Sequence, residues 1–386
     1  MFKAATATTK EPFSKQAGRS LGNALLESLG QSPNACWLFC APGPRLRDLL
    51  VGVNELIHPG LLIGCTTDGE ISSAGFSTGS AVLGGIATDQ IDFHVAAVEG
   101  LRRDSQKAGC ELGKLLPADV RHVQIFTDGL TGNGCAILRG LTSALGKSIP
   151  ISGGTAGDAG RFRRTWQFIG TRVLTDAAVA VGFSGDFSIG TGVRSGWSPI
   201  GIAKKVTRAS GNVVFELNGQ PALEVYERFL GKHADKLPGV GVEYPFGLVD
   251  RSGDVGDPDY HLLRATMSVN REEGSITFAG EIPEGALVRL TCGDYSSVLE
   301  AAEKAARVAQ EGLQGGCSAM VFFYSCMARK IVLGRRAKEE IDRIRSVFGS
   351  DLPVVGFYTF GEYCRVACDG PSLFHNETAT VSVIGV

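Results

Sequence analysis

The sequence carries one short pattern, G-x-x-T-x-G-E, at two distant places: as GCTTDGEI at residues 64–71 and as GFYTFGEY at residues 356–363. Glycine is favoured where a turn is tight or two backbones approach closely. The threonine and the glutamate add a hydroxyl and a carboxylate to that turn. Two copies this far apart indicate an internal repeat, and a repeat decides the fold before any single element does.

Upstream of each copy the sequence predicts the same order of elements: helix, strand, helix, strand. The helices are predicted from apolar residues at helical spacing and the buried strands from short apolar runs. These elements lie at residues 14–29, 36–40, 44–57 and 60–64 before the first copy, and at 295–313, 317–325, 335–349 and 352–356 before the second.

A third copy of the same order lies between these two and ends in GGTAGD at residues 153–158, which is one residue shorter than the other motifs. Its predicted helices and strands occupy residues 104–116, 121–129, 133–146 and 148–153. In this alignment Thr155 takes the place of the motif threonine and Asp158 takes the place of the motif glutamate.

Strand-like runs follow each motif, so each unit reads as α-β-α-β followed by a β-meander. This pattern predicts an α/β protein of layered mixed sheets flanked by helices. A length of 386 residues is enough for about two domains. Residues 198–294 break the repeat, so we place the boundary near Trp197, with one domain over 1–197 and the other over 198–386.

Composition excludes several classes of protein. The net charge is −2 and no basic stripe is visible, which argues against a nucleic-acid binder. No apolar run approaches the roughly 20 residues that span a bilayer, and the first residues lack the apolar core of a signal peptide. We therefore expect a cytoplasmic protein with reduced cysteines.

The motif residues suit ligand binding, because strand ends in layered α/β sheets are where small ligands usually bind. The acids of the motifs suit a cationic or amine-bearing ligand, and the threonines supply hydroxyls. The acids are Asp68, Glu70, Asp158 and Glu362, and the threonines are Thr67, Thr155 and Thr359. A phosphate cradle is disfavoured, since the carboxylates would repel it. The alternative is that each carboxylate holds its own neighbouring backbone and binds nothing.

Two further segments carry chemistry. FFYSCMARK places Cys326 and Arg329 just after a buried strand, and FHNET places His375 and Asn376 between two strands. A cysteine with a distant histidine can act as nucleophile and base, so a small-molecule hydrolase using Cys326 or the paired acids is an alternative function. No sequence signature of a cysteine protease supports it, and we expect no enzyme. The six histidines never cluster.

Taken together and in order, these motifs resemble the FIST family, with its N-terminal half in 1–197 and its C-terminal half in 198–386. The resemblance runs from about residue 35 to the end, and the chain looks like a stand-alone member. The family's recurring positions fall here on Gly64, Thr67, Gly69, Glu70, Gly157, Asp158, Gly219, Pro221, Ala222, Cys326, Arg329, Gly356, Thr359, Gly361, Glu362, His375 and Asn376.

The resemblance implies an intracellular sensory protein that binds a small ligand, with amino acids proposed, and signals to a partner. Some members resemble nitric-oxide-sensing proteins, which bind haem and regulate a histidine kinase. In a haem-binding member the iron ligand would be a histidine other than the recurring His375, and His261 and His94 are the candidates. A scaffold that binds a protein through its surface is a third possibility.

Overall fold

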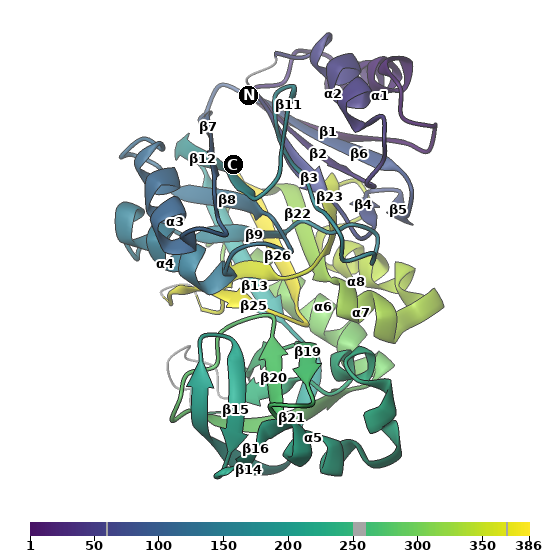
Figure 1. Cartoon of the computed structure of the whole chain (residues 1–386). Helices are drawn as coiled ribbons and strands as arrows, with labels where there is room; N and C mark the ends of the chain where they lie inside the picture. The colour runs from purple at the N-terminus through teal and green to yellow at the C-terminus, as the bar shows by residue number, and fades with distance from the viewer. Residues whose placement is uncertain (59–60, 250–259, 368–369) are drawn as a thin grey trace.

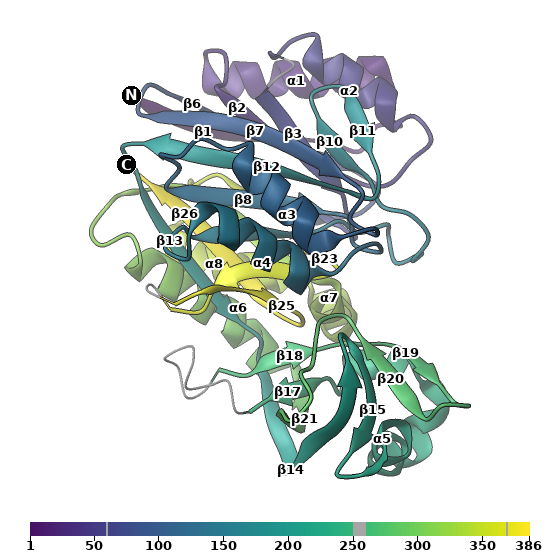
Figure 2. The same cartoon turned by 60° about the vertical axis from the view of Figure 1, so that its left-hand side comes forward.

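The computed structural model describes residues 1–58, 61–249, 260–367 and 370–386. Figures 1 and 2 show a large body made of three sheets with helices on the outside, and a small domain below it. The three sheets of the body have the same plan, one for each repeat unit found in the sequence.

The first sheet has the order β1-β6-β2-β3-β10-β11, and β2 and β3 form its parallel central pair. Helices α1 (Lys15–Leu29) and α2 (Leu46–Asn54) pack on its outer face through leucines and alanines. The strands are β1 (Phe2–Thr9), β6 (Ala81–Thr88), β2 (Ala35–Cys40), β3 (Leu62–Thr66), β10 (Gln167–Ile169) and β11 (Arg172–Leu174).

The second sheet has the order β25-β24-β9-β8-β12-β7, with β8 and β9 parallel at its centre. Helices α3 (Ser105–Lys114) and α4 (Gly134–Leu145) cover its outer face. The strands are β25 (Ser372–His375), β24 (Glu362–Arg365), β9 (Ile151–Thr155), β8 (His122–Thr127), β12 (Ala177–Gly185) and β7 (Ile91–Glu99).

The third sheet has the order β13-β26-β22-β23-β4-β5, with β22 and β23 parallel at its centre. Helices α6 (Tyr295–Glu311) and α8 (Lys338–Phe348) cover it, and the short α7 (Met327–Leu333) follows β22. The strands are β13 (Ser188–Arg194), β26 (Ala379–Gly385), β22 (Ser318–Cys326), β23 (Val354–Thr359), β4 (Glu70–Ser72) and β5 (Gly75–Ser77).

Each unit donates the hairpin after its motif to a neighbouring sheet. The hairpin β4–β5 of the first unit joins the third sheet, β24–β25 of the third unit joins the second sheet, and β10–β11 of the second unit joins the first. The exchange closes on itself, so the three units are interlocked through their motifs.

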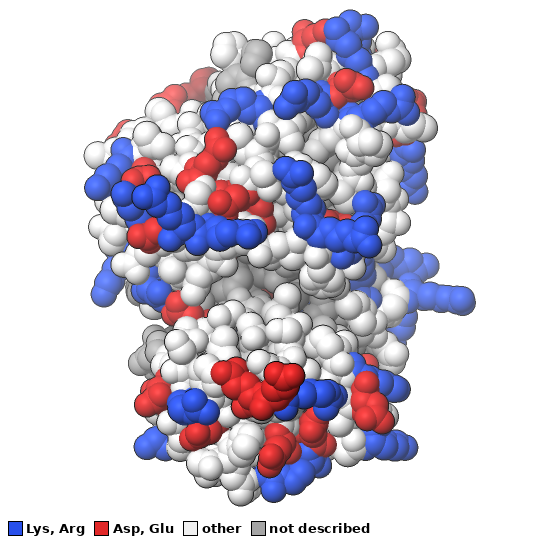
Figure 3. Space-filling view, in the orientation of Figure 1, with Lys and Arg blue, Asp and Glu red and all other residues white. Residues whose placement is uncertain are grey.

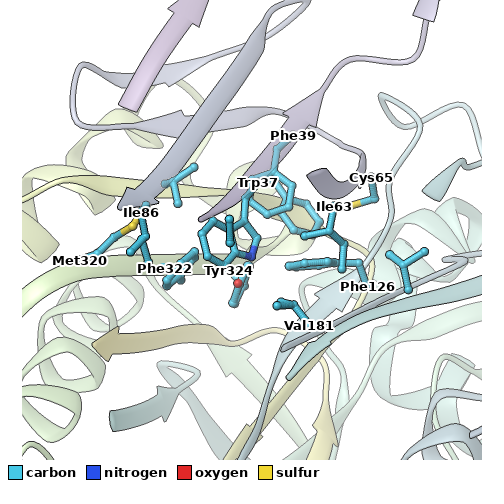
Figure 4. Close-up of a cluster of buried hydrophobic side chains, with 14 of the residues drawn as sticks. Trp37, Phe39, Ile63, Cys65, Ile86, Phe126, Val181, Met320, Phe322 and Tyr324 are labelled. Carbon is cyan, nitrogen blue, oxygen red and sulfur yellow. The ribbon is translucent and has the colours of Figure 1, made fainter. Parts of the chain in front are cut away.

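The inner faces of the three sheets meet in one aromatic core. Trp37 and Phe39 come from the first sheet, Phe126 from the second, and Phe322 and Tyr324 from the third, and all are fully buried (Figure 4). The rings of Trp37 and Phe322 lie 4.9 Å apart and those of Phe39 and Phe126 5.2 Å apart, both edge to face, a favourable geometry for aromatic pairs.

The small domain is built on a sheet of order β18-β17-β21-β14-β15-β20-β19, packed against α5 (Ala222–Leu230). Short 3-10 turns lie at Gly231–Lys236, Gly239–Val242 and, in the body, Gly334–Arg336. The strands are β14 (Trp197–Ser210), β15 (Val213–Leu217), β16 (Gln220–Pro221), β17 (Phe246–Leu248), β18 (Leu262–Arg264), β19 (Thr266–Asn270), β20 (Ser275–Phe278) and β21 (Leu287–Gly293).

The predicted fold class, mixed sheets flanked by helices in repeated units, is confirmed. The small domain begins at Trp197, where β14 leaves the body, and the chain returns to the body after Gly293. The large body is therefore discontinuous in sequence, with the small domain inserted before the third unit. Within the described residues every helix is too short or too polar to cross a membrane.

Candidate functional site

The three motif turns meet and are tied together through their backbones. The amide of Asp68 donates to the carbonyl of Tyr358 at 2.9 Å, and the amide of Gly157 donates to Thr66 at 2.9 Å. The amide of Thr155 donates to Gly361 at 2.8 Å. Each turn thus bonds to the strand end of a neighbouring unit, so the first task of the motif is to lock the hairpin exchange.

Both motif glutamates bind hydroxyl groups of their own unit. Glu70 accepts hydrogen bonds from Thr67 and from the hydroxyl and amide of Ser80, and it is 1% exposed. Glu362 accepts from Thr359 and from the hydroxyl and amide of Thr378, and it is fully buried. Both carboxylates are engaged in holding their hairpins.

Strand register corrects the alignment of the middle motif. Phe357, Gly154 and Cys65 each come directly after the first motif glycine of their strand, so they are equivalent positions. Glu70 pairs with Phe357, Glu362 pairs with Gly154, and Gln167 pairs with Cys65. The acid of the middle unit is therefore replaced by Gln167, and equating Asp158 with the motif glutamates was wrong. By the same register Thr155 corresponds to Thr66 and Tyr358, not to Thr67 and Thr359.

Asp158 has a different task. Its buried carboxylate accepts hydrogen bonds from four consecutive backbone amides, those of residues 161–164, at 2.7 to 3.1 Å. Thr155 is 5% exposed, and its hydroxyl has no hydrogen-bond partner among the described residues.

Burial raises the pKa of Glu362 from 4.5 to about 7, against the hydrogen bonds from Thr359 and Thr378. At a pH between 4.5 and about 7, Glu362 keeps its proton in the folded protein and loses it in the unfolded chain. The free energy of unfolding therefore falls as the pH rises through this range. The difference of about 2.5 pKa units corresponds to roughly 3 kcal/mol. Glu362→Gln introduces the residue that the middle unit has at this position, Gln167. It should make the free energy of unfolding depend less on pH.

The measurement is urea unfolding of the wild type and Glu362→Gln at intervals from pH 5 to 8. The control is Glu272→Gln, which changes an exposed carboxylate of the small domain. Equal slopes of stability against pH in the wild type and in Glu362→Gln would contradict the assignment.

Arg329 fastens the connection between body and small domain. Its guanidinium is fully buried and donates to Glu340 at 2.6 Å, to the carbonyl of Val298 at 2.7 Å and to the carbonyl of Ser195. Ser195 precedes β14 and Val298 lies in the first turn of α6, so one side chain holds both crossings between the two parts.

Cys326 lies at the end of β22 and is 3% exposed. Burial, followed by the charges of Glu362 and Glu377, raises the pKa of its thiol well above the usual value. A reactive cysteine needs an accessible thiolate, and this environment disfavours one. The geometry therefore gives no support to Cys326 as a nucleophile.

The segment His375–Asn376–Glu377 is fully buried where β25 meets the small domain. His375 Nδ1 contacts the hydroxyl of Tyr260, and Nε2 lies 2.9 Å from the carbonyl of Cys364. Burial lowers the pKa of His375 to about 3, so the ring is neutral. The side chains of Asn376 and Glu377 have no hydrogen-bond partner among the described residues.

A cleft of about 770 Å³ lies between α4 and β25 of the body and the small domain; Phe374 lines it, whereas the segment 375–377 is not in its described lining. This volume is in the range of small-molecule sites. Its apolar lining includes leucines and Phe374, and its charged lining residues are Arg139, Lys147, Arg264 and Glu281. Figure 3 shows that the molecule is hollowed where the body meets the small domain.

The charges in the cleft do not balance. Glu281 of the small domain binds Arg139 of α4 at 2.6 and 2.9 Å, and this pair lowers the pKa of Glu281. Arg264 is 3% exposed and donates to backbone carbonyls of Glu281, Leu263 and Phe374 at 2.9 to 3.1 Å, and to the sulfur of Cys135 at 3.7 Å. No described carboxylate forms an ion pair with it.

Sequence reasoning missed the four charged residues of this cleft. Arg139 and Lys147 lie on or just after a helix whose polar face looks solvated in the sequence, and Arg264 and Glu281 lie in a part that breaks the repeat. A buried arginine in a strand, as in YHLLRA, was the available signal. The two predicted haem ligands lie elsewhere: neither His94, in β7, nor His261, before β18, is among the described residues that line the cleft.

The fold and this cleft define a class: a two-domain α/β protein of three interlocked sheets with an interdomain cleft of small-molecule size. The chain belongs to the FIST family, because the FIST N domain matches residues 7–220 and the FIST C domain matches residues 222–365. These domains are signal-transduction sensor domains, which implies small-molecule binding.

Similar proteins include an uncharacterized protein of Methanocaldococcus jannaschii, 24% identical over 82% of this chain and 63% of its own length. An uncharacterized protein of Mycobacterium bovis is 26% identical over 96% of each chain. A crystal structure of cyanuric acid hydrolase from A. caulinodans aligns with 100% of this chain and 99% of the hydrolase chain, at 9% identity. The TM-score is 0.38, which is too low to support an inference about this chain.

Proposed function

We propose that this protein is a sensor whose small-molecule ligand binds in the cleft between α4, β25 and the small domain. The observation that carries the proposal is that the cleft is lined by both parts of the molecule. A ligand there has different contacts in different arrangements of the two parts. Differential contact is what lets binding shift a conformational equilibrium.

The connection between the two parts supports this role. Residues 195–196 and 294 carry the chain between body and small domain, and Gly196 has a φ of 88°. Both crossings are held at Arg329, so the rest of the interface on the cleft side depends on contacts such as Arg139–Glu281. A ligand that competes for these contacts would change the arrangement of the two parts, and a signalling partner would respond to that change. The first candidate for the partner is a histidine kinase.

Ligand chemistry follows from the lining. Arg264 lines the cleft, and the described partners of its guanidinium are backbone carbonyls and the sulfur of Cys135, so its positive charge has no paired carboxylate, while leucines and Phe374 offer an apolar wall. A small amphipathic carboxylate, such as an amino acid with an apolar side chain, satisfies both. The motif acids Glu70 and Glu362 do not line this cleft and already bind hydroxyls.

The test is thermal unfolding and calorimetric titration with the standard L-amino acids and with short-chain carboxylates. A ligand that stabilises the wild type should bind about 10- to 100-fold more weakly to Arg264→Lys, because one charge-assisted hydrogen bond is worth roughly 1.5–3 kcal/mol. Thr142→Trp should block the cleft from α4 while leaving Arg264 in place. Arg172→Ala, in an exposed pair with Glu99, is the control.

Binding that persists unchanged in both cleft variants would refute this site. Haem as the ligand stays a prediction, and neither of the two histidines predicted to bind it, His94 and His261, lines this cleft. The hydrolase alternative has no activated nucleophile at Cys326.

A further inference from the structure

The loop after β9 departs from the threefold plan of the body. In the first and third units the motif glycine is followed at once by the hairpin, as Gly69–Glu70 and Gly361–Glu362. In the second unit Asp158 stands at the glycine position and the hairpin begins at Gln167. Residues 159–166 are therefore extra, and two sister units show that the hairpin exchange does not require them.

The extra loop is held in a defined shape. The carboxylate of Asp158, 2% exposed, accepts from the four amides of residues 161–164. Phe162 has a φ of 51° and stacks on Phe360, with ring centroids 4.8 Å apart. The amide of Gly129 donates to the hydroxyl of Thr165 at 3.2 Å. A loop ordered in advance loses little entropy when it binds.

The ordered loop presents cations around an aromatic ring. Arg161, Arg163 and Arg164 are exposed, and Phe162 is 48% exposed. Asp158, the acid that begins the loop, is buried and directed at the backbone, and no carboxylate of the described residues forms an ion pair with the three arginines. Arginine and aromatic residues are the types enriched in protein interfaces. Figure 3 shows basic side chains on the body with acidic ones between them, above a group of acidic side chains on the small domain.

We propose that the loop 159–166 is a docking surface for an acidic segment of a partner protein. Guanidinium groups bind carboxylates in a bidentate manner, and Phe162 gives an apolar contact between them. A nucleic acid would also meet the arginines, but the chain as a whole carries a net charge of −2. Three arginines on one short loop are a small footprint for a phosphate backbone. An acidic protein segment fits the loop better.

The test uses a fluorescein-labelled peptide of six glutamates and two phenylalanines, titrated with the full chain and followed by fluorescence anisotropy. Arg161→Glu/Arg163→Glu/Arg164→Glu should weaken binding by at least about tenfold. Lys205→Glu/Lys232→Glu/Lys236→Glu makes the same change in net charge with exposed lysines of the small domain, and it should stay within about twofold. Asp158→Ala, which keeps the arginines but frees the loop, should weaken binding several-fold.

An equal loss in the two triple variants, or no peptide binding by the wild type, overturns the proposal. Tighter binding of a thymidine octanucleotide through the same three arginines overturns it in favour of nucleic acid. The cleft variant Thr142→Trp should bind the peptide normally, so a failure of the ligand proposal and a failure of this one are told apart.

Discussion

Gly356→Ala should unfold the protein or reduce its stability by about 3 kcal/mol or more. A Cβ at this position would lie 1.8 Å from the carbonyl oxygen of Phe323, on the strand paired with it. The obstacle is backbone in the centre of a sheet, so no rotamer change relieves it, and overpacking of this kind costs about 1–3 kcal/mol or more. The measurement is the urea unfolding midpoint, or the soluble yield where the variant does not fold.

The matched control is Gly239→Ala, in a 3-10 turn of the small domain, where an added Cβ meets nothing within 4 Å. Its stability should change by no more than about 1 kcal/mol. The same argument applies to the other two motif glycines: a Cβ at Gly64 would lie 1.8 Å from Leu38 and at Gly153 2.1 Å from Ile125. A stable Gly356→Ala would show that the strand pairs can separate and that the motif glycine serves something else.

Arg329→Met should lower the free energy of unfolding by about 3–5 kcal/mol, because it leaves Glu340 as a buried charge without its partner. Glu340 is fully buried and also accepts from Tyr358 at 2.8 Å and from Ser325 at 3.0 Å. The double variant Arg329→Met/Glu340→Gln should recover part of the loss, since the uncompensated charge is then gone. Urea unfolding followed by tryptophan fluorescence measures both.

Arg336→Ala is the control, because its pair with Glu339 is half exposed and surface pairs contribute about 0–1 kcal/mol. The comparison also separates two roles for Arg329. If it contacted ligand, its replacement would change ligand affinity and leave stability nearly unchanged. The structure predicts the reverse, because all its described bonds are to Glu340, Ser195 and Val298.

The sequence predicted some residues of the candidate site, and only the structure brought the others together. Thr67, Glu70, Thr359 and Glu362 are brought near the three interlocked turns, as their repetition suggested, but their hydrogen bonds are to their own hairpins. His375 and Asn376 follow Phe374, which lines the interdomain cleft, but neither is among the described residues that line it. Arg264 and Glu281 could not be linked to α4 from the sequence, since that contact joins segments more than a hundred residues apart.

The sequence alone determined the repeat, the order of elements in each unit and the class of sheet, because hydrophobic periodicity and strand-end glycines are local signals. Only the tertiary structure decided which sheet each hairpin joins, that Gln167 replaces the motif acid in the middle unit, and where the two parts enclose a cleft. Strand register and domain contacts depend on which distant segments pair in space. Residues 159–166 show the difference: an insertion becomes visible only when the sister strands are aligned by their hydrogen bonds.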